Sequence, residues 1–179
     1  MIKLKDILLE SDIFIPRRVE DRKKRYIAAI QKRIQDYINN GSNGNLDLSN
    51  TPIEKLPDNL TKVRDNLDLN NSHIQSLPDG LFVGWNLYLQ NSHIKRLPDG
   101  LKVGHYLNLY NTLIKELPDN LIVGGSLTAN YTKLEKLPIG LKVMGDFHIM
   151  STPLSQKYTK EELIKLLPGV DGNIIVNYD

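Results

Sequence analysis

Residues 86–104, NLYLQNSHIKRLPDGLKVG, decide the fold of this chain, because nearly the same letters come both before and after them. The Leu-Pro pair in this stretch recurs along the chain at spacings of 21, 20, 20 and 20 residues, and a leucine lies eleven residues before each proline. The prolines are Pro57, Pro78, Pro98, Pro118 and Pro138, and the leucines are Leu46, Leu67, Leu87, Leu107 and Leu127. A register this constant indicates a repeat protein.

The repeat unit predicts one short strand followed by two turns. Leu87 and Leu89 have the spacing of side chains that point to the same face of a strand, and we expect this strand to be about four residues long. Ser92 follows, at a position that holds Thr or Ser in every copy, and its hydroxyl can bond turn backbone. Ile94 returns to the interior, and residues 97–100 (LPDG) form a turn that no helix interrupts.

A unit of about twenty residues cannot bury its own leucines, so it must stack on copies of itself. Parallel strands in such a stack lie about 4.8 Å apart. The sequence therefore predicts a right-handed solenoid, α/β or mainly β, with a parallel sheet of short strands and an interior of Leu, Ile and Val.

The two ends of the chain predict covers for the stack. Residues 17–39 have an apolar stripe at helical spacing and follow Pro16, so we expect a helix there and an N-terminal helical cap over residues 1–40. Residues 41–154 hold the repeats, about six rungs. Residues 155–179 form a C-terminal cap, with a helix opened by the capping box Thr159–Glu162 and a closing strand at 173–176.

The repeat resembles the leucine-rich repeat family, whose pattern is L-x-x-L-x-L-x-x-N-x-L, although here the Asn position carries Thr or Ser. Its short unit with L-P-x-x-L is similar to the repeats of bacterial effector proteins. Nearly the whole chain resembles a group of small proteins encoded by tailed bacteriophages, which share the segments IPRR, DYINNGS and TPLSQKYTKEELI. This resemblance implies a phage-encoded protein that meets a host bacterial protein in the host cytoplasm. The related effectors add a ubiquitin ligase domain with a catalytic cysteine, which this chain lacks.

Composition excludes several classes of function. The chain of 179 residues has 40% hydrophobic and 25% charged residues, as ordinary soluble proteins do. It contains no cysteine, which excludes disulfides, thiolate metal sites and cysteine nucleophiles. No apolar run approaches the roughly 20 residues that span a bilayer, and acids interrupt the opening stretch, so we expect neither a membrane segment nor a secretory signal.

The strand positions that point outward are the candidate binding surface, which we expect to be the concave face of the stack. They vary from rung to rung while the inward positions stay apolar, as in a recognition surface on a fixed scaffold. Aromatic residues gather in the middle, as in a binding hot spot, although aromatics also favour pleated surfaces for packing reasons alone. The predicted partner-binding residues are Asp47, Asp68, Trp85, Tyr88, Tyr106, Asn108, Tyr110, Thr128, Tyr131 and His148.

Two other functions stay open at this point. One is self-assembly as a structural module, with the N-terminal helix or an uncovered end pairing two chains, so that the protein is a monomer or a homodimer. The other, less favoured because the net charge is only +2, is nucleic-acid binding by a basic helix whose charges nearby acids partly balance. The residues for nucleic-acid binding are Arg17, Arg18, Arg22, Lys23, Lys24 and Arg25.

The sequence offers no constellation typical of an enzyme. His73 and His93 occupy equivalent positions in adjacent repeats, about 5 Å apart, but the matching positions in other repeats supply no third metal ligand. The glycines and aspartates follow the repeat period and are turn residues, not a phosphate-binding loop or an acid–base pair. We therefore expect no catalytic residues, no metal and no cofactor.

Overall fold

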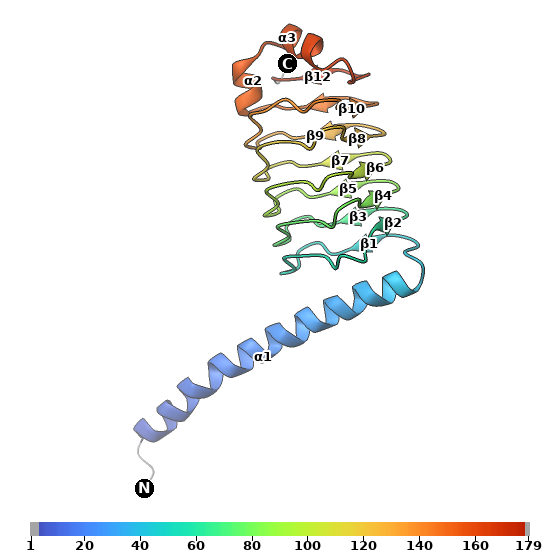
Figure 1. Cartoon of the computed structure of the whole chain (residues 1–179). Helices are drawn as coiled ribbons and strands as arrows, with labels where there is room; N and C mark the ends of the chain where they lie inside the picture. Colours follow the sequence, from blue (N-terminus) through green and yellow to red (C-terminus); the bar gives the residue numbers. More distant parts are fainter. Residues whose placement is uncertain (1–3, 178–179) are drawn as a thin grey trace. The chain divides into compact units, whose positions relative to one another are not determined.

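The computed structural model describes the backbone of residues 4–177 and the side chains of residues 19–177. The chain divides after Asp36 into two compact units. The first contains helix α1 (Leu4–Asn39) up to Asp36, and the second contains the last residues of α1 and a stack of strands with two short helices at its C-terminal end. Figure 1 shows the rungs of the second unit stacked in sequence order.

Helix α1 begins at Leu4, so the predicted start at residue 17 is wrong. Pro16 lies inside the helix rather than before it. A proline removes one backbone hydrogen bond, but the residues on both sides favour helix and continue it. The end at Asn39 agrees with the prediction. Gly41 there has φ +80° and donates to the carbonyl of Ile38 (3.0 Å), which closes the last turn.

The second unit is a solenoid of parallel strands in two sheets, which confirms the predicted fold class. The first sheet contains β1 (Leu46–Asp47), β3 (Leu67–Asp68), β5 (Leu87–Tyr88), β7 (Leu107–Asn108), β9 (Leu127–Thr128), β11 (Phe147–His148) and β12 (Ile174–Ile175). The second contains β2 (Lys62–Val63), β4 (Phe82–Val83), β6 (Lys102–Val103), β8 (Ile122–Val123) and β10 (Lys142–Val143). The prediction of one strand per repeat missed the second sheet, and the strands are two residues long rather than four.

The leucines used to find the repeat form one continuous interior column. Parallel pairing aligns each of them with its counterpart in the next rung, and Phe147 continues the column. The valines of the second sheet pair in the same way. All of these side chains are buried, so each rung contributes Leu from one sheet and Val from the other to a shared core.

The turn hydroxyls make the hydrogen bonds predicted for them. In five rungs the Thr or Ser side chain donates to the carbonyl of the residue three positions earlier, over 2.6–2.9 Å. These side chains are Thr51, Ser72, Thr112, Thr132 and Thr152. Ser92 is the exception, because its buried hydroxyl has no partner among the described residues.

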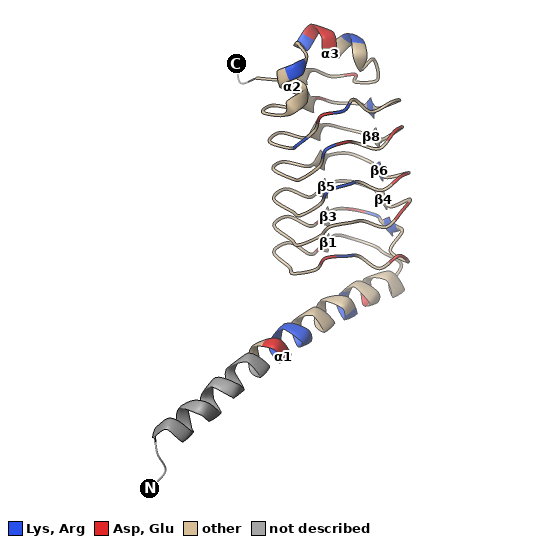
Figure 2. Ribbon diagram, turned by 60° about the vertical axis from the view of Figure 1, so that its left-hand side comes forward, with Lys and Arg blue, Asp and Glu red and all other residues tan. Residues whose placement is uncertain are grey.

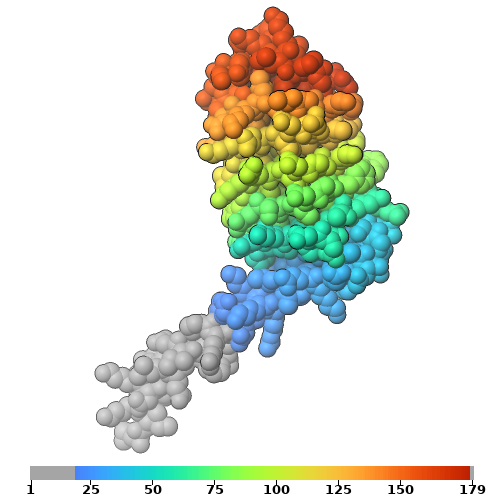
Figure 3. All heavy atoms as spheres, in the orientation of Figure 1, coloured from blue at the N-terminus to red at the C-terminus, as the bar shows by residue number. Residues whose placement is uncertain are grey.

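A column of glycines lets neighbouring rungs approach closely beside the second sheet. A Cβ atom at Gly104 would collide with the carbonyl oxygen of Gly84 in the preceding rung, and Gly84 and Gly124 face the same restriction. The Gly104 amide donates to the carbonyl of Val83 over 2.8 Å. Figure 3 shows the result, with the atoms of successive rungs in contact along the stack.

The C-terminal end carries the predicted helix and closing strand. Helix α3 (Lys160–Leu166) begins after Thr159, whose hydroxyl accepts from the Glu162 amide (3.2 Å) while the Glu162 carboxylate accepts from the Thr159 amide (2.8 Å). Strand β12 pairs with β11 and ends the first sheet. A further helix, α2 (Pro153–Lys157), was not predicted; Thr152 caps it through a second capping box with Ser155.

Candidate protein-binding face

The register brings the central row of predicted binding residues together on the outer side of the first sheet. Each residue pairs with its counterpart in the next rung, and Ile175 of β12 ends the row. In order, the row is Asp47, Asp68, Tyr88, Asn108, Thr128, His148 and Ile175. We call this row, with the outward residues that flank it in each rung, the first-sheet face.

The first-sheet face was expected to be concave, and the second sheet removes the reason for that expectation. A stack curves when one side has a wider spacing between repeats than the other. Here both sides carry parallel strands, which share one spacing of about 4.8 Å. Figure 1 accordingly shows the rungs stacked without a strong bend.

Aromatic side chains meet in the middle of the first-sheet face. The rings of Tyr88 and Tyr106 lie edge to face, with their centroids 6.1 Å apart, and the Tyr106 hydroxyl donates to Thr128 Oγ1 over 2.9 Å. Trp85 lies over His105, 5.7 Å between centroids, and 56% of its surface is exposed. Aromatic pairs at these distances stabilise one another and hold their rings in place.

A second aromatic pair lies one rung further along, between the rungs of β7 and β9. Tyr110 and Tyr131 make an edge-to-face contact with centroids 5.2 Å apart. They are 39% and 40% exposed, so each ring keeps an open surface. Tyr131 has φ 59°, an uncommon conformation for a bulky residue, and this turn carries its ring toward Tyr110.

Asn108 belongs to the predicted set but is only 8% exposed. Its amide nitrogen donates to Gln90 Oε1 (2.7 Å), and its side-chain oxygen accepts from the backbone amide of Tyr110 (3.0 Å). Asn108 therefore holds its neighbours in position and offers little surface of its own to a partner. The sequence predicted an outward side chain but could not show that it bonds Gln90 and the backbone of Tyr110.

An asparagine ladder that the sequence analysis missed supports one flank of the face. The side-chain oxygen of Asn45 accepts a hydrogen bond from the backbone amide of Asn66 (3.1 Å). In the next rungs the side-chain oxygen of Asn66 accepts from the Asn86 amide, and that of Asn86 accepts from the Tyr106 amide. Asn86 Oδ1 also lies 3.0 Å from His105 Nδ1. The recurrence of Asn at one repeat position was the available signal. The ladder fixes the backbone next to Tyr106.

A shallow hollow lies beside these aromatic rings. It has a volume of about 580 Å³, and Gly125 and Gly145 lie where Trp85 and His105 stand in earlier rungs. Because two consecutive rungs lack a side chain here, the row of rings ends at an open space. We call it the glycine hollow; its lining is Asn86, Tyr88, His105, Tyr106, Gly125, Ser126 and Gly145.

The first rungs of the face are acidic. Burial raises the pKa of Asp68 above its ordinary value, and the neighbouring Asp47 carboxylate raises it further, against a hydrogen bond from the Asn70 amide. In the last rungs the backbone amide of Asn173 lowers the pKa of Asp146. The surroundings therefore disfavour the charged form of Asp68 and favour the charged form of Asp146.

The histidine pair predicted from the repeat is present. His73 and His93 stack with centroids 5.0 Å apart and planes 15° apart, and both are exposed. Within residues 19–177, no group of three or more His, Cys, Asp or Glu side chains could hold a metal ion. The two rings thus make a stacking contact between adjacent rungs.

The basic residues predicted for nucleic-acid binding lie on α1. Arg22, Lys23, Lys24 and Arg25 are exposed, and Figure 2 shows basic positions in this part of the helix. Arg17 and Arg18 lie outside the residues whose side chains the structure describes. Nucleic-acid binding stays a prediction. In the described part of the chain, no helix combines the length and the apolar character needed to cross a bilayer.

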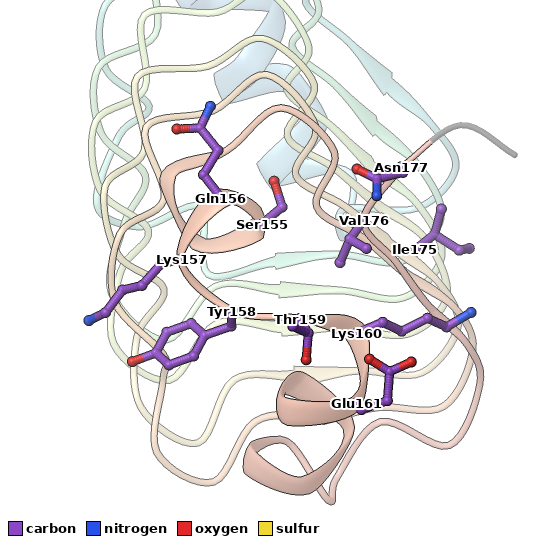
Figure 4. A pocket seen from close by; sticks show the side chains of 10 residues that line it. All are labelled: Ser155, Gln156, Lys157, Tyr158, Thr159, Lys160, Glu161, Ile175, Val176 and Asn177. Atoms are coloured by element: carbon purple, nitrogen blue, oxygen red, sulfur yellow. The ribbon is translucent and has the colours of Figure 1, made fainter.

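A further hollow of about 500 Å³ lies where the C-terminal elements meet (Figure 4). It is lined by α2, the start of α3, the end of β12 and the segment after it. Its charged groups are Lys157, Lys160 and Glu161, which are all exposed, and the Lys157 ammonium lies 4.9 Å from the ring centre of Tyr158.

The chain was compared with known proteins in three ways. No protein-family model matches it, and no match was found among curated proteins or among solved structures.

Proposed function

We propose that the protein is a non-enzymatic scaffold that binds another protein through the first-sheet face. The observation that carries the proposal is an aromatic cluster in which Trp85, Tyr110 and Tyr131 are exposed while Tyr88 and Tyr106 are half-buried. The asparagine ladder fixes the backbone beside Tyr106. Tyr and Trp supply much contact energy at a low entropic cost, and they are enriched in hot spots. Because the rings are already held by neighbours, little order has to be gained on binding.

The contrast between the two sides of each strand supports the same proposal. The inward positions of the first sheet are Leu or Phe in every rung up to β11, whereas the outward row changes from acid to aromatic, amide, hydroxyl and imidazole. Packing alone explains the inward constancy. A row that changes chemistry along most of its length is typical of recognition of one irregular partner surface.

The glycine hollow gives the partner a place to insert a side chain. Tyr88 and Tyr106 form one wall, and the polar groups of Asn86 and Ser126 are nearby to accept or donate hydrogen bonds. A hot-spot side chain commonly enters a pocket of this kind, surrounded by contacts that exclude water. We propose an aromatic or long aliphatic side chain of the partner as its occupant.

The sequence resemblance suggests the identity of the partner. If the chain is encoded by a phage, the partner is a host bacterial protein, and binding would act by occlusion or sequestration in the host cytoplasm without any chemical step. Self-assembly and nucleic-acid binding by α1 are the alternative proposals.

The test is an affinity purification from bacterial lysate with the variant Tyr88→Ala/Tyr106→Ala/Tyr110→Ala. Truncation of a hot-spot residue costs about 2 kcal/mol or more, so we expect the triple variant to lose the partner that the wild type retains. The control is Lys62→Ala/Phe82→Ala/Lys102→Ala, which changes exposed residues of the second sheet. Retention of every partner by the tyrosine variant would remove the proposal.

A further inference from the structure

A basic hollow lies on the segments that run from the first sheet to the second. It has a volume of about 490 Å³ and draws its lining from three consecutive rungs, which backbone hydrogen bonds such as Leu113 N–H to Ile94 O (3.2 Å) hold in register. Figure 2 shows Lys and Arg positions on successive rungs of the stack. The lining residues are Lys95, Arg96, Leu113, Lys115, Glu116 and Lys133.

The charges of the basic hollow are unbalanced. Its single carboxylate, Glu116, accepts a hydrogen bond from Lys136 (2.8 Å), outside the hollow, and lies 3.8 Å from Arg96. These interactions hold the pKa of Glu116 below its ordinary value. In residues 19–177, none of the ammonium groups of Lys95, Lys115 and Lys133 forms an ion pair. The carboxylate is thus occupied while three cations are free for an anion.

Two of these cations hold the same position in adjacent rungs, Lys95 in one and Lys115 in the next. Glu135 continues the row, yet it forms no ion pair with Lys115 within the described residues. An anion placed between Lys95 and Lys115 could pair with both ammonium groups.

The hollow also has an apolar centre. Leu113 is 44% exposed, at a position that holds His93 in the rung before and Lys133 in the rung after. A leucine surrounded by ammonium groups fits a ligand that has an apolar side chain between carboxylates. The six lining side chains include no aromatic ring on which a nucleic-acid base could stack, which favours a peptide over a single-stranded nucleic acid.

We infer that the basic hollow is a second binding site, which takes an acidic peptide segment with an apolar residue flanked by Asp or Glu. The apolar side chain packs on Leu113, and the carboxylates pair with Lys95, Lys115 and Lys133. This site is separate from the first-sheet face and does not depend on the function proposed for it.

The probe is a fluorescein-labelled peptide of sequence Asp-Glu-Leu-Glu-Asp, titrated with the full chain at low salt and followed by fluorescence anisotropy. We expect the variant Lys95→Gln/Lys115→Gln/Lys133→Gln to bind at least about tenfold more weakly, because exposed charges contribute mainly through summed attraction. The control variant Lys62→Gln/Lys102→Gln/Lys142→Gln removes the same charge from the second sheet, and we expect it to bind within about twofold of the wild type. Circular dichroism verifies that both variants fold.

Two further probes separate the apolar contribution to peptide binding from the contribution of charge. A peptide with Ser in place of Leu should bind more weakly to the wild type, and this difference should vanish in Leu113→Ser. An oligothymidylate of similar charge should bind more weakly than the peptide. No binding of the acidic peptide, equal losses in the two triple variants, or tighter binding of the oligonucleotide would each overturn the inference.

Discussion

The substitution Leu87→Ala tests whether the leucine column carries the stability of the stack. Leu87 is fully buried, and Leu67 and Leu107 lie next to it in the adjacent rungs. The change removes three carbon atoms from the core, which costs about 2.4 kcal/mol at about 0.8 kcal/mol for each. Backbone ladders hold the rungs on both sides, so the cavity cannot collapse fully, and the total loss should be about 3–5 kcal/mol.

The assay is urea denaturation followed by far-ultraviolet circular dichroism, with thermal denaturation beside it. For a chain of this size a loss of 3–5 kcal/mol lowers Tm by about 6–20 °C. The matched control is Leu113→Ala, the same chemical change at a leucine that is 44% exposed, where we expect a loss below about 1 kcal/mol. Equal losses for the two variants, or a loss below about 1 kcal/mol for Leu87→Ala, would refute the reasoning.

Three other predictions concern close packing, charge and α1. Gly104→Ala should lower the free energy of unfolding, measured by chemical denaturation, by about 1–3 kcal/mol, because the added methyl group meets the Gly84 carbonyl. Gly80 has φ +66° and open space around it, so Gly80→Asn should change the same free energy by less than about 0.5 kcal/mol. Asp68→Asn should raise Tm near pH 7. The pKa of Asp68 is raised in the folded state, so ionisation of this carboxyl lowers the stability as the pH rises above the ordinary pKa of 3.8. The gain in Tm should disappear in thermal denaturation below pH 3.8, and a gain that persists there would contradict the assignment. If residues 22–25 bind nucleic acid, the affinity in a gel shift should fall steeply with salt and be lost when these four charges are neutralised; unchanged binding would dismiss the helix as the site.

The interior of the stack could be predicted from the sequence because the repeat period fixes it. The spacing of 20 or 21 residues between Leu46, Leu67, Leu87, Leu107 and Leu127 leaves one register in which all of them are buried, and the structure has that register. The closing strand and the capping box at Thr159 were predictable for the same kind of reason, since each depends on neighbouring residues alone.

The second sheet was not predicted, because its strands are only two residues long. A pair such as Lys102–Val103 is too short to show a period of two. The signal lay instead in the glycine after each of three valines, which is explained only when backbones of adjacent rungs approach closely. The start of α1 was misplaced because Pro16 was taken as a boundary, although a proline can be accommodated inside a helix at a cost.

The candidate sites were predictable in part. The outward row followed from the strand period, so the positions of Asp47, Tyr88 and Thr128 on one face were expected. The glycine hollow and the basic hollow were not, because each depends on the path of three or more rungs and on which side chains are missing or unpaired. The burial of Asn108 likewise depends on the conformations of its neighbours.

The most direct measurement of the central claim is photo-crosslinking in bacterial cells from benzoylphenylalanine placed at position 110 or position 82. Tyr110 lies on the first-sheet face and Phe82 on the second sheet, and both side chains are exposed aromatics, so the probe is tolerated equally at both positions. If the first-sheet face binds the partner, position 110 gives a discrete crosslinked protein and position 82 does not. A crosslink from position 82 with none from position 110 would contradict the account.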